Sequence, residues 1–114
     1  MLNSGDIVDL DLGLPQCREA GFRHPAVVLS AQRILTAEPS VVYVVPLTST
    51  VRQFHSEIRI DPDVHNGLAY SSAVQCQHLR AASTGRIISV RGNVGAAPLA
   101  QIRETIAVLL DIPS

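Results

Sequence analysis

Short runs of alternating or β-branched residues, each closed by a turn signal, constrain the fold of this chain most. Val8 and Leu10 alternate with Asp9 and Asp11, which is the period of two typical of a half-buried strand. Gly, Pro, Asn and Asp residues separate the later runs. Strands are predicted over residues 6–12, from Pro25 to Ser30, and over 41–48, 54–60, 72–79 and 87–90. The sequence therefore predicts about six short strands.

One helical pattern follows the strands. Pro98 suits a first helical position, and Leu99, Ile102 and Ile106 follow at the spacing of one helix face, before Pro113 ends the segment. We therefore expect a mainly β (α+β) chain, with a small β-barrel-like sheet closed by a C-terminal amphipathic helix. The length of 114 residues suits a single domain covering residues 1–114.

Composition excludes several classes of protein. With 46% apolar and 17% charged residues the chain is not disordered, and no apolar run is long enough to span a membrane. The first residues lack the basic and apolar regions of an export signal, so we expect a cytoplasmic protein without a membrane partner. Cys17 and Cys76 are too few for a disulfide scaffold, and no histidine pair has metal-ligand spacing. No metal or other cofactor is expected.

The charges are unevenly distributed. The net charge is −1 and all nine basic residues are Arg. Residues 1–17 carry three acids and no base, whereas Arg80, Arg86, Arg91 and Arg103 lie in a stretch, 64–103, without Asp or Glu. Arg suits bidentate contacts to phosphate, although a GC-rich genome would give the same bias.

The predicted second and third strands place chemically useful groups close together. They are joined by a short connection, which favours antiparallel pairing. If the pairing is symmetric about Thr36, His24 faces Thr48. An imidazole, the neighbouring Arg23 guanidinium and a hydroxyl would then meet at one end of the sheet, unless a bulge shifts the register.

Several segments in a fixed order resemble a known toxin family. They are Gly5-Asp6-Ile7-Val8, Arg23-His24-Pro25-Ala26, Val45-Pro46-Leu47-Thr48-Ser49, Asn66-Gly67-Leu68 and Val74 to Arg80. This order and spacing resembles the MazF/PemK/Kid toxins of type II toxin–antitoxin systems over nearly the whole chain. The resemblance implies an SH3-like barrel, a homodimer, a cognate antitoxin, and a metal-independent endoribonuclease that cuts single-stranded RNA. It also implies attack by the 2′-hydroxyl, leaving 2′,3′-cyclic phosphate and 5′-hydroxyl ends.

Arg23, His24 and Thr48 are the catalytic candidates that the resemblance supports. Such a reaction needs proton transfer and stabilisation of charge on phosphoryl oxygens. In the family, an Arg precedes the proline that begins the second strand. Here His24 precedes that proline, Pro25, and the Arg stands one place earlier, at Arg23. His24 would act as acid or base, with Arg23 on the phosphate, and Thr48 matches the family's hydroxyl residue. The alternative is a turn histidine in a degenerate or slow enzyme.

RNA-binding candidates lie in two segments. Near Thr48, Ser49 and Arg52 are placed to contact RNA, although Ser49 also suits a turn, and Phe22 beside Arg23 is the best candidate for base stacking. In the second segment the candidates are Gln77, His78 and Arg80. There the resemblance has an Arg and an Asp as an acid/base pair, but this chain has Gln75 and Gln77, so that pair cannot be carried over.

Simpler interpretations of this second segment stay open. Gln75, Gln77 and His78 would read or stack on bases, or would form the solvent face of an edge strand. Arg80 would contact RNA or make a structural ion pair. Two other functions also stay open. The first is a CcdB-like gyrase poison, against which the absence of Trp counts. The second is a catalytically weak SH3-like module that binds RNA or antitoxin.

Overall fold

The computed structural model describes residues 1–11 and 24–113, which form strands and short helices followed by one long helix. The elements in chain order are β1 (Asp6–Leu10), β2 (His24–Val28), α1 (Gln32–Thr36), β3 (Val41–Thr48), β4 (Glu57–Ile60), β5 (Ser72–Gln75), the 3-10 helix η2 (Cys76–His78), β6 (Arg80–Ser83), the 3-10 helix η3 (Thr84–Arg86), β7 (Ile87–Asn93) and α2 (Ala96–Leu109). Within these residues, no helix is both long and apolar enough to cross a membrane.

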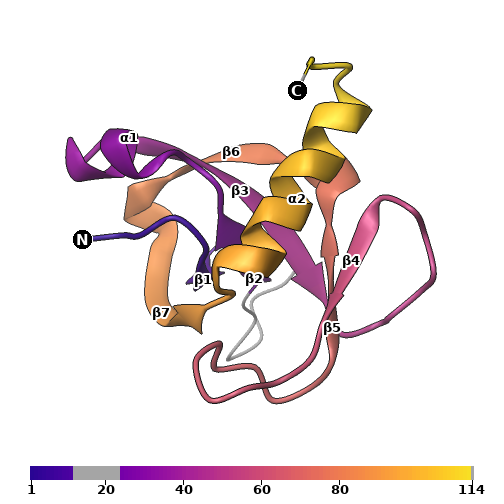
Figure 1. Cartoon of the computed structure of the whole chain (residues 1–114). Coiled ribbons are helices and arrows are strands. Elements are labelled where there is room, and N and C mark those ends of the chain that lie inside the picture. The colour runs from indigo at the N-terminus through magenta and orange to yellow at the C-terminus, as the bar shows by residue number, and fades with distance from the viewer. Residues whose placement is uncertain (12–23, 114) are drawn as a thin grey trace.

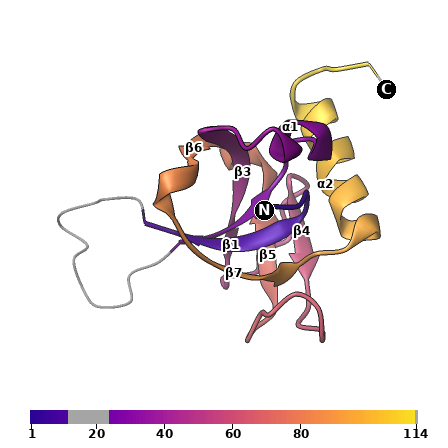
Figure 2. The same ribbon diagram turned by 90° about the vertical axis from the view of Figure 1, so that its left-hand side faces the viewer.

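The strands form one curved sheet in the order β4-β5-β3-β2-β1-β7, and β6 also pairs with β3. The eight residues of β3 serve two neighbours on one side, because its first half pairs with β6 and its last residues pair with β5. Helix α2 lies across the sheet (Figure 1), and the turned view separates it from β6 (Figure 2). The expected mainly β fold with a C-terminal helix is confirmed, although in the described chain the sheet is open between β4 and β7.

Both faces of the central strands are buried. Ile7, Val27 and Val45 belong to a hydrophobic cluster that α2 completes with Leu99, Ile102 and Ile106. Their chain neighbours on the opposite face, Val8, Val28 and Val44, belong to a second cluster that includes Leu35 of α1. Since side chains alternate along a strand, each central strand contributes to both clusters. The prediction of a half-buried first strand was therefore wrong, because all of β1 is buried, including Asp9.

Residues 1–11 and 24–113 contain seven strands, one more than the six positions predicted. The missed strand is β6, whose sequence Arg-Ala-Ala-Ser has neither alternation nor β-branched residues. Its conformation comes from pairing with Val41–Val44 of β3. Long-range backbone pairing has overridden weak local preference here.

Several boundaries differ from those predicted. The fifth strand stops at Gln75 and the chain turns into η2, so residues 76–78 are not strand. The fourth starts at Glu57 rather than residue 54, because the Glu57 N–H donates to the Phe54 carbonyl in a turn (3.1 Å). The second stops at Val28, and the following segment forms the short helix α1. A single turn of 3-10 helix, η3, connects β6 to β7.

Candidate functional site

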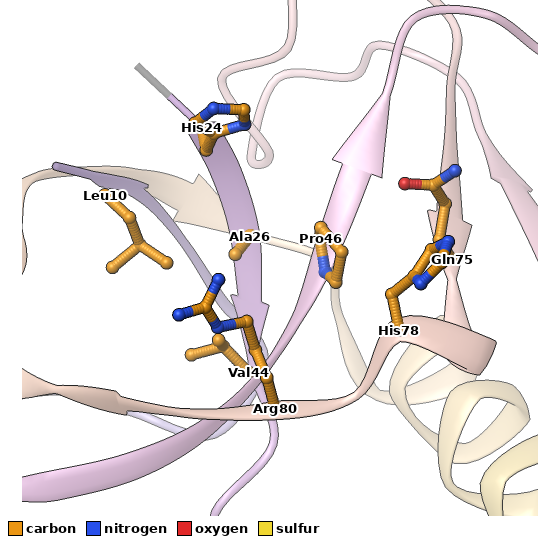
Figure 3. A pocket seen from close by; sticks show the side chains of 8 residues that line it. All are labelled: Leu10, His24, Ala26, Val44, Pro46, Gln75, His78 and Arg80. Atoms are coloured by element: carbon orange, nitrogen blue, oxygen red, sulfur yellow. The ribbon is translucent and has the colours of Figure 1, made fainter. Parts of the chain in front are cut away.

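A pocket of about 360 Å³ opens at the end of the second hydrophobic cluster (Figure 3). Its floor is apolar and its rim carries side chains that can exchange protons or form hydrogen bonds. The lining residues are Leu10, His24, Ala26, Val44, Pro46, Gln75, His78 and Arg80. An apolar floor with a few polar groups at the rim is typical of ligand sites, and the volume lies at the lower end of their range.

The predicted register of β2 and β3 is confirmed. Ala26 pairs with Pro46 and Val28 pairs with Val44, as symmetry about Thr36 requires. The ladder ends at Ala26–Pro46, and beyond it the strands take other partners: His24 pairs with Leu10 of β1 and Thr48 pairs with Ala73 of β5. His24 and Thr48 therefore lie at the same end of the sheet without forming a strand pair with each other.

Thr48 continues the face of β3 that forms the pocket. Val44 and Pro46 line the pocket, and Thr48 follows Pro46 by the two-residue repeat that returns a strand side chain to the same face. The Thr48 hydroxyl oxygen accepts the Thr50 N–H at 3.1 Å, while Ser49 is exposed. This hydrogen bond uses an acceptor site of Thr48 and leaves its O–H available as a donor.

Three predicted residues meet at the pocket rim. His24 comes from the start of β2, His78 from the end of η2 and Arg80 from the start of β6. Figure 3 shows the Arg80 guanidinium directed toward the middle of the pocket, with His24 at one end and His78 across from it. Between residues 24 and 113 and in residues 1–11, the three ion pairs are Arg52–Glu57, Arg59–Asp61 and Arg91–Asp9, so none involves Arg80.

A residue that the sequence did not single out, Glu57, organises the wall beside the pocket. Its Oε2 atom accepts hydrogen bonds from Arg52 Nη2 at 2.7 Å, Gln77 Nε2 at 2.7 Å and Gln75 Nε2 at 3.3 Å. The Glu57 side chain is only 1% exposed, whereas that of Arg52 is 42% exposed and lies 4.3 Å from the centre of the Phe54 ring. Arg52 and Gln77 thus belong to one hydrogen-bonded group with Gln75.

Glu57 keeps its charge in this group. Burial alone raises the pKa of the carboxyl, but hydrogen bonds from Arg52, Gln77 and Gln75, with the charge of Arg52, outweigh it and hold the pKa below its ordinary value. The carboxylate is therefore ionised at neutral pH. It acts as a common acceptor for a loop, a strand and a 3-10 helix.

The position of Glu57 follows from a register that the sequence contains. Glu57 pairs with Gln75 and Ile60 pairs with Ser72, so the β4–β5 hairpin is symmetric about residue 66. Asn66-Gly67 marks that turn in the sequence. Symmetric pairing about a turn, which predicts the register of β2 and β3, therefore also predicts Glu57 opposite Gln75. The alternative placed Gln75, Gln77 and His78 on the solvent face of an edge strand. The edge strand is β4 and β5 lies inside it, so Gln75 is not on an edge, whereas Gln77 and His78 are exposed residues of η2.

Other predicted residues have no described structure. Phe22, Arg23 and Cys17 lie outside the described residues.

Cys76 is a buried free cysteine, and burial raises the pKa of its thiol to about 11, so it stays protonated. Across residues 1–11 and 24–113, no three His, Cys, Asp or Glu side chains are grouped as a metal site would require.

Comparison with known proteins gives a match over most of the chain. The model of the family described as PemK-like, MazF-like toxin of type II toxin–antitoxin system matches residues 3–110. The endoribonuclease MazF9 of Mycobacterium tuberculosis (strain ATCC 25618 / H37Rv) is 30% identical over 116 residues, covering 98% of this chain and 98% of that protein.

Solved structures share the fold at lower identity. A crystal structure of MazE-MazF from Deinococcus radiodurans has a TM-score of 0.77 and 24% identity, covering 98% of this chain and 97% of that one. An endoribonuclease in complex with its cognate antitoxin from Mycobacterial species has a TM-score of 0.79 and 19% identity, covering 100% and 99%. At these identities the likeness establishes the fold.

Proposed function

Because the chain belongs to the PemK-like, MazF-like toxin family of type II toxin–antitoxin systems, we propose that it is an endoribonuclease that cuts single-stranded RNA. The observation that carries this proposal is the pocket where His24, His78 and Arg80 converge, beside the start of β2 and the end of β3. Two imidazoles and a guanidinium supply proton transfer and charge stabilisation around one phosphate. The similarity to an endoribonuclease over 98% of the chain supports the same reaction.

The proposed chemistry assigns a role to each group. The 2′-hydroxyl of the RNA attacks the adjacent phosphorus, and the P–O5′ bond breaks as the new P–O2′ bond forms. Two protons move in this step, one leaving the 2′-hydroxyl and one reaching the leaving 5′ oxygen. His24 transfers one of them, and the second imidazole, His78, or water transfers the other. Arg80 and the Thr48 hydroxyl stabilise the phosphoryl oxygens, together with Arg23. The products are a 2′,3′-cyclic phosphate and a 5′-hydroxyl, and the residues named need no metal for these steps.

We assign RNA contacts to side chains on both sides of the pocket. His78 and Phe22 offer rings for base stacking, while Ser49 and Gln77 offer hydrogen bonds. Arg52, close to Thr48 in the sequence, contributes positive charge. Its hydrogen bond to Glu57 holds its guanidinium at the wall that contains Glu57. The substrate in the cell would be mRNA, in the cytoplasm.

Protein partners are part of the proposal. The end of α2 exposes apolar side chains, and a groove of about 380 Å³ is lined by Phe54, Val108 and Leu109 among others. Such surface suits protein contacts. We propose a homodimer and a cognate antitoxin as partners, as similarity to an endoribonuclease–antitoxin complex supports. Light scattering on the purified chain, alone and with the co-expressed antitoxin, tests both.

The test of function is cleavage of a long single-stranded RNA by the purified protein in EDTA, followed by mapping of the cut ends. Specific cuts with 5′-hydroxyl ends are expected. Absence of cleavage would overturn the proposal. Trapping of gyrase on DNA would then identify a CcdB-like poison, and RNA or antitoxin binding without cutting would identify a binding module.

Single substitutions test the pocket. His24→Ala and Thr48→Ala are each expected to lower kcat/KM by at least about tenfold, because each removes a group acting on the phosphate. Thr48→Val removes only the hydroxyl and should match Thr48→Ala. His65→Ala is the control, since His65 is an exposed imidazole that does not line the pocket. Normal cleavage by His24→Ala would refute the role given to His24.

A further inference from the structure

The hydrogen bonds that Gln75 and Gln77 donate to Glu57 fix which atom of each side-chain amide, nitrogen or oxygen, faces away from Glu57. A carboxylate can only accept hydrogen bonds, whereas a glutamine amide has a nitrogen that donates and an oxygen that accepts. Gln75 and Gln77 must therefore turn their nitrogens toward Glu57 Oε2, as the distances of 3.3 and 2.7 Å show. Each amide then directs its carbonyl oxygen away from Glu57.

The orientation at Gln75 is visible in Figure 3. Its amide oxygen lies on the side facing His24 and the pocket, and its nitrogen lies on the far side. Gln77 belongs to η2, next to His78 of the pocket rim, and its side chain is exposed. Gln75 thus offers a carbonyl acceptor on the wall of the pocket, and Gln77, which does not line the pocket, offers a second one on the exposed surface next to His78.

We propose that Glu57 is a positioning residue that sets base preference, by holding Gln75 and Gln77 as acceptors for the amino group of an RNA base. This inference rests on the proposed function, because it assigns the sequence preference of the same site. Adenine, cytosine and guanine carry an amino group, whereas uracil does not. Uracil has one N–H donor on its base, at ring N3, whereas an amino group has two. Two carbonyl acceptors should therefore favour an amino-bearing base over uracil at the position they contact.

Reversal of either amide is opposed by the whole cluster. Turning one glutamine would set its oxygen against the carboxylate, and Glu57 is 1% exposed, so water cannot readily separate them. The Arg52 guanidinium, at 2.7 Å, holds the carboxylate in place and keeps it charged. A neutral residue of the same shape at position 57 would allow both orientations. Glu57→Gln therefore removes the constraint on amide orientation with little change in volume.

The first experiment maps cut ends in a single-stranded RNA pool with a randomised segment, using wild-type protein and Glu57→Gln. The wild type should require an amino-bearing base at one position, and Glu57→Gln should accept uracil there. We expect discrimination to fall about tenfold, the effect of one lost hydrogen bond to a ligand. A uniform loss of rate with unchanged preference would overturn the proposal, because a purely structural role predicts that result. Wild-type preference for uracil at every selective position would also overturn it.

The second experiment measures binding, so that it does not depend on cleavage. The probes are two short oligonucleotides drawn from the pool, each 2′-deoxy at the cut position, one carrying the preferred base and one its analogue without the amino group. Fluorescence anisotropy should show about tenfold weaker binding of the analogue by wild type and nearly equal binding by Glu57→Gln. Unchanged discrimination in Glu57→Gln would refute the inference.

The two hypotheses can fail separately. If wild-type protein binds with amino-group dependence but never cuts, the ribonuclease function is wrong and the assignment of Glu57 stands. If wild-type binding shows no amino-group dependence, the assignment is wrong even when cleavage is normal.

Matched variants separate orientation from ion pairing. Asp61 follows the last residue of β4, and its carboxylate accepts a hydrogen bond from Arg59 Nε at 2.9 Å. Asp61→Asn removes this carboxylate and should keep wild-type discrimination. Should Glu57→Gln fail to fold, Gln75→Met and Gln77→Met remove the acceptors one at a time while Glu57 stays. At least one of them must lose amino-group dependence, and if neither does, the proposal is wrong.

Discussion

Two buried carboxylates in this molecule are held in opposite ways. Asp9 of β1 uses both of its oxygens, accepting from Arg91 Nε at 3.0 and 3.1 Å and from Ser89 at 2.9 Å, and Arg91 Nη2 lies 2.9 Å from Oδ1. Both donors come from the neighbouring strand β7. Glu57 takes its three donors on Oε2, and within the described residues its buried Oε1 has no hydrogen-bond partner.

This contrast separates a structural role from a positioning role. Donors on one adjacent strand are placed by the sheet itself, so Asp9 joins two strands that already pair. The donors on Glu57 come from a loop, from β5 and from η2, which the sheet alone does not fix relative to one another. A buried carboxylate oxygen without a partner raises the free energy of the folded state, which reduces the net contribution of Glu57 to stability. Substitution of Asp9 should therefore have the larger effect on the free energy of unfolding, and substitution of Glu57 the larger effect on the site.

Asp9→Ala should produce the largest loss of stability. It leaves Arg91 without its partner at the β1–β7 junction. Breaking a fully buried pair costs about 3–5 kcal/mol, and a loss of about 2–3 kcal/mol is expected here because the Arg91 side chain is 34% exposed and can be hydrated. Denaturant unfolding measures it. A loss no larger than that of Glu57→Gln would remove the distinction between the two carboxylates.

Glu57→Gln should lower stability by about 1 kcal/mol or less, because Arg52 is 42% exposed and this pair is partly screened by water. Its main effect should be on base preference, because it frees the amides of Gln75 and Gln77 to turn. Thermal unfolding of both variants side by side tests the ranking. A larger loss of stability than in Asp9→Ala would make Glu57 a structural residue.

The stabilisation from Glu57 should depend on pH in a defined direction. Its pKa in the folded chain lies below the ordinary value of 4.5, so the folded state binds a proton less readily than the unfolded state. The contribution is complete above that ordinary value and is lost as pH falls through the lowered pKa. The difference in Tm between wild type and Glu57→Gln should thus shrink on acidification. A difference that grows would contradict this sign.

Asp61→Asn should have the smallest effect. The Arg59 and Asp61 side chains are 62% and 64% exposed, so water and salt screen their attraction. Neither Tm nor base preference should change measurably. A clear change in either would show that exposed pairs on β4 matter as much as the buried one.

Local patterns in the sequence predicted much of the fold. The run of β-branched and aromatic residues Val41-Val42-Tyr43-Val44-Val45 predicted β3 with its correct end at Thr48, and symmetry about Thr36 predicted its register with β2. Strand β6 was missed because Arg80-Ala81-Ala82-Ser83 is extended only through pairing with β3. Such dependence on distant residues leaves no periodic signal in the segment itself.

The site was only partly predictable, because it too depends on the pairing of segments that are distant in the sequence. His24, His78 and Arg80 were expected from resemblance, and the pocket brings them together. Glu57 was missed because its partners at positions 52, 75 and 77 come from three elements that meet only after β4, β5 and β3 pair. An acid in an alternating strand looks like any solvent-facing residue until its cross-strand neighbour, here Gln75, is known.

The convergence of three donors on a single oxygen also limits how this site can diverge among relatives. Loss of Glu57 alone would leave the guanidinium of Arg52 and two amides without their acceptor, while loss of one glutamine would leave the acid buried with fewer donors. Residues in contact are expected to covary. Positions 52, 57, 75 and 77 should therefore be exchanged together during evolution, so that a change in preferred RNA sequence arrives as a coordinated set of substitutions.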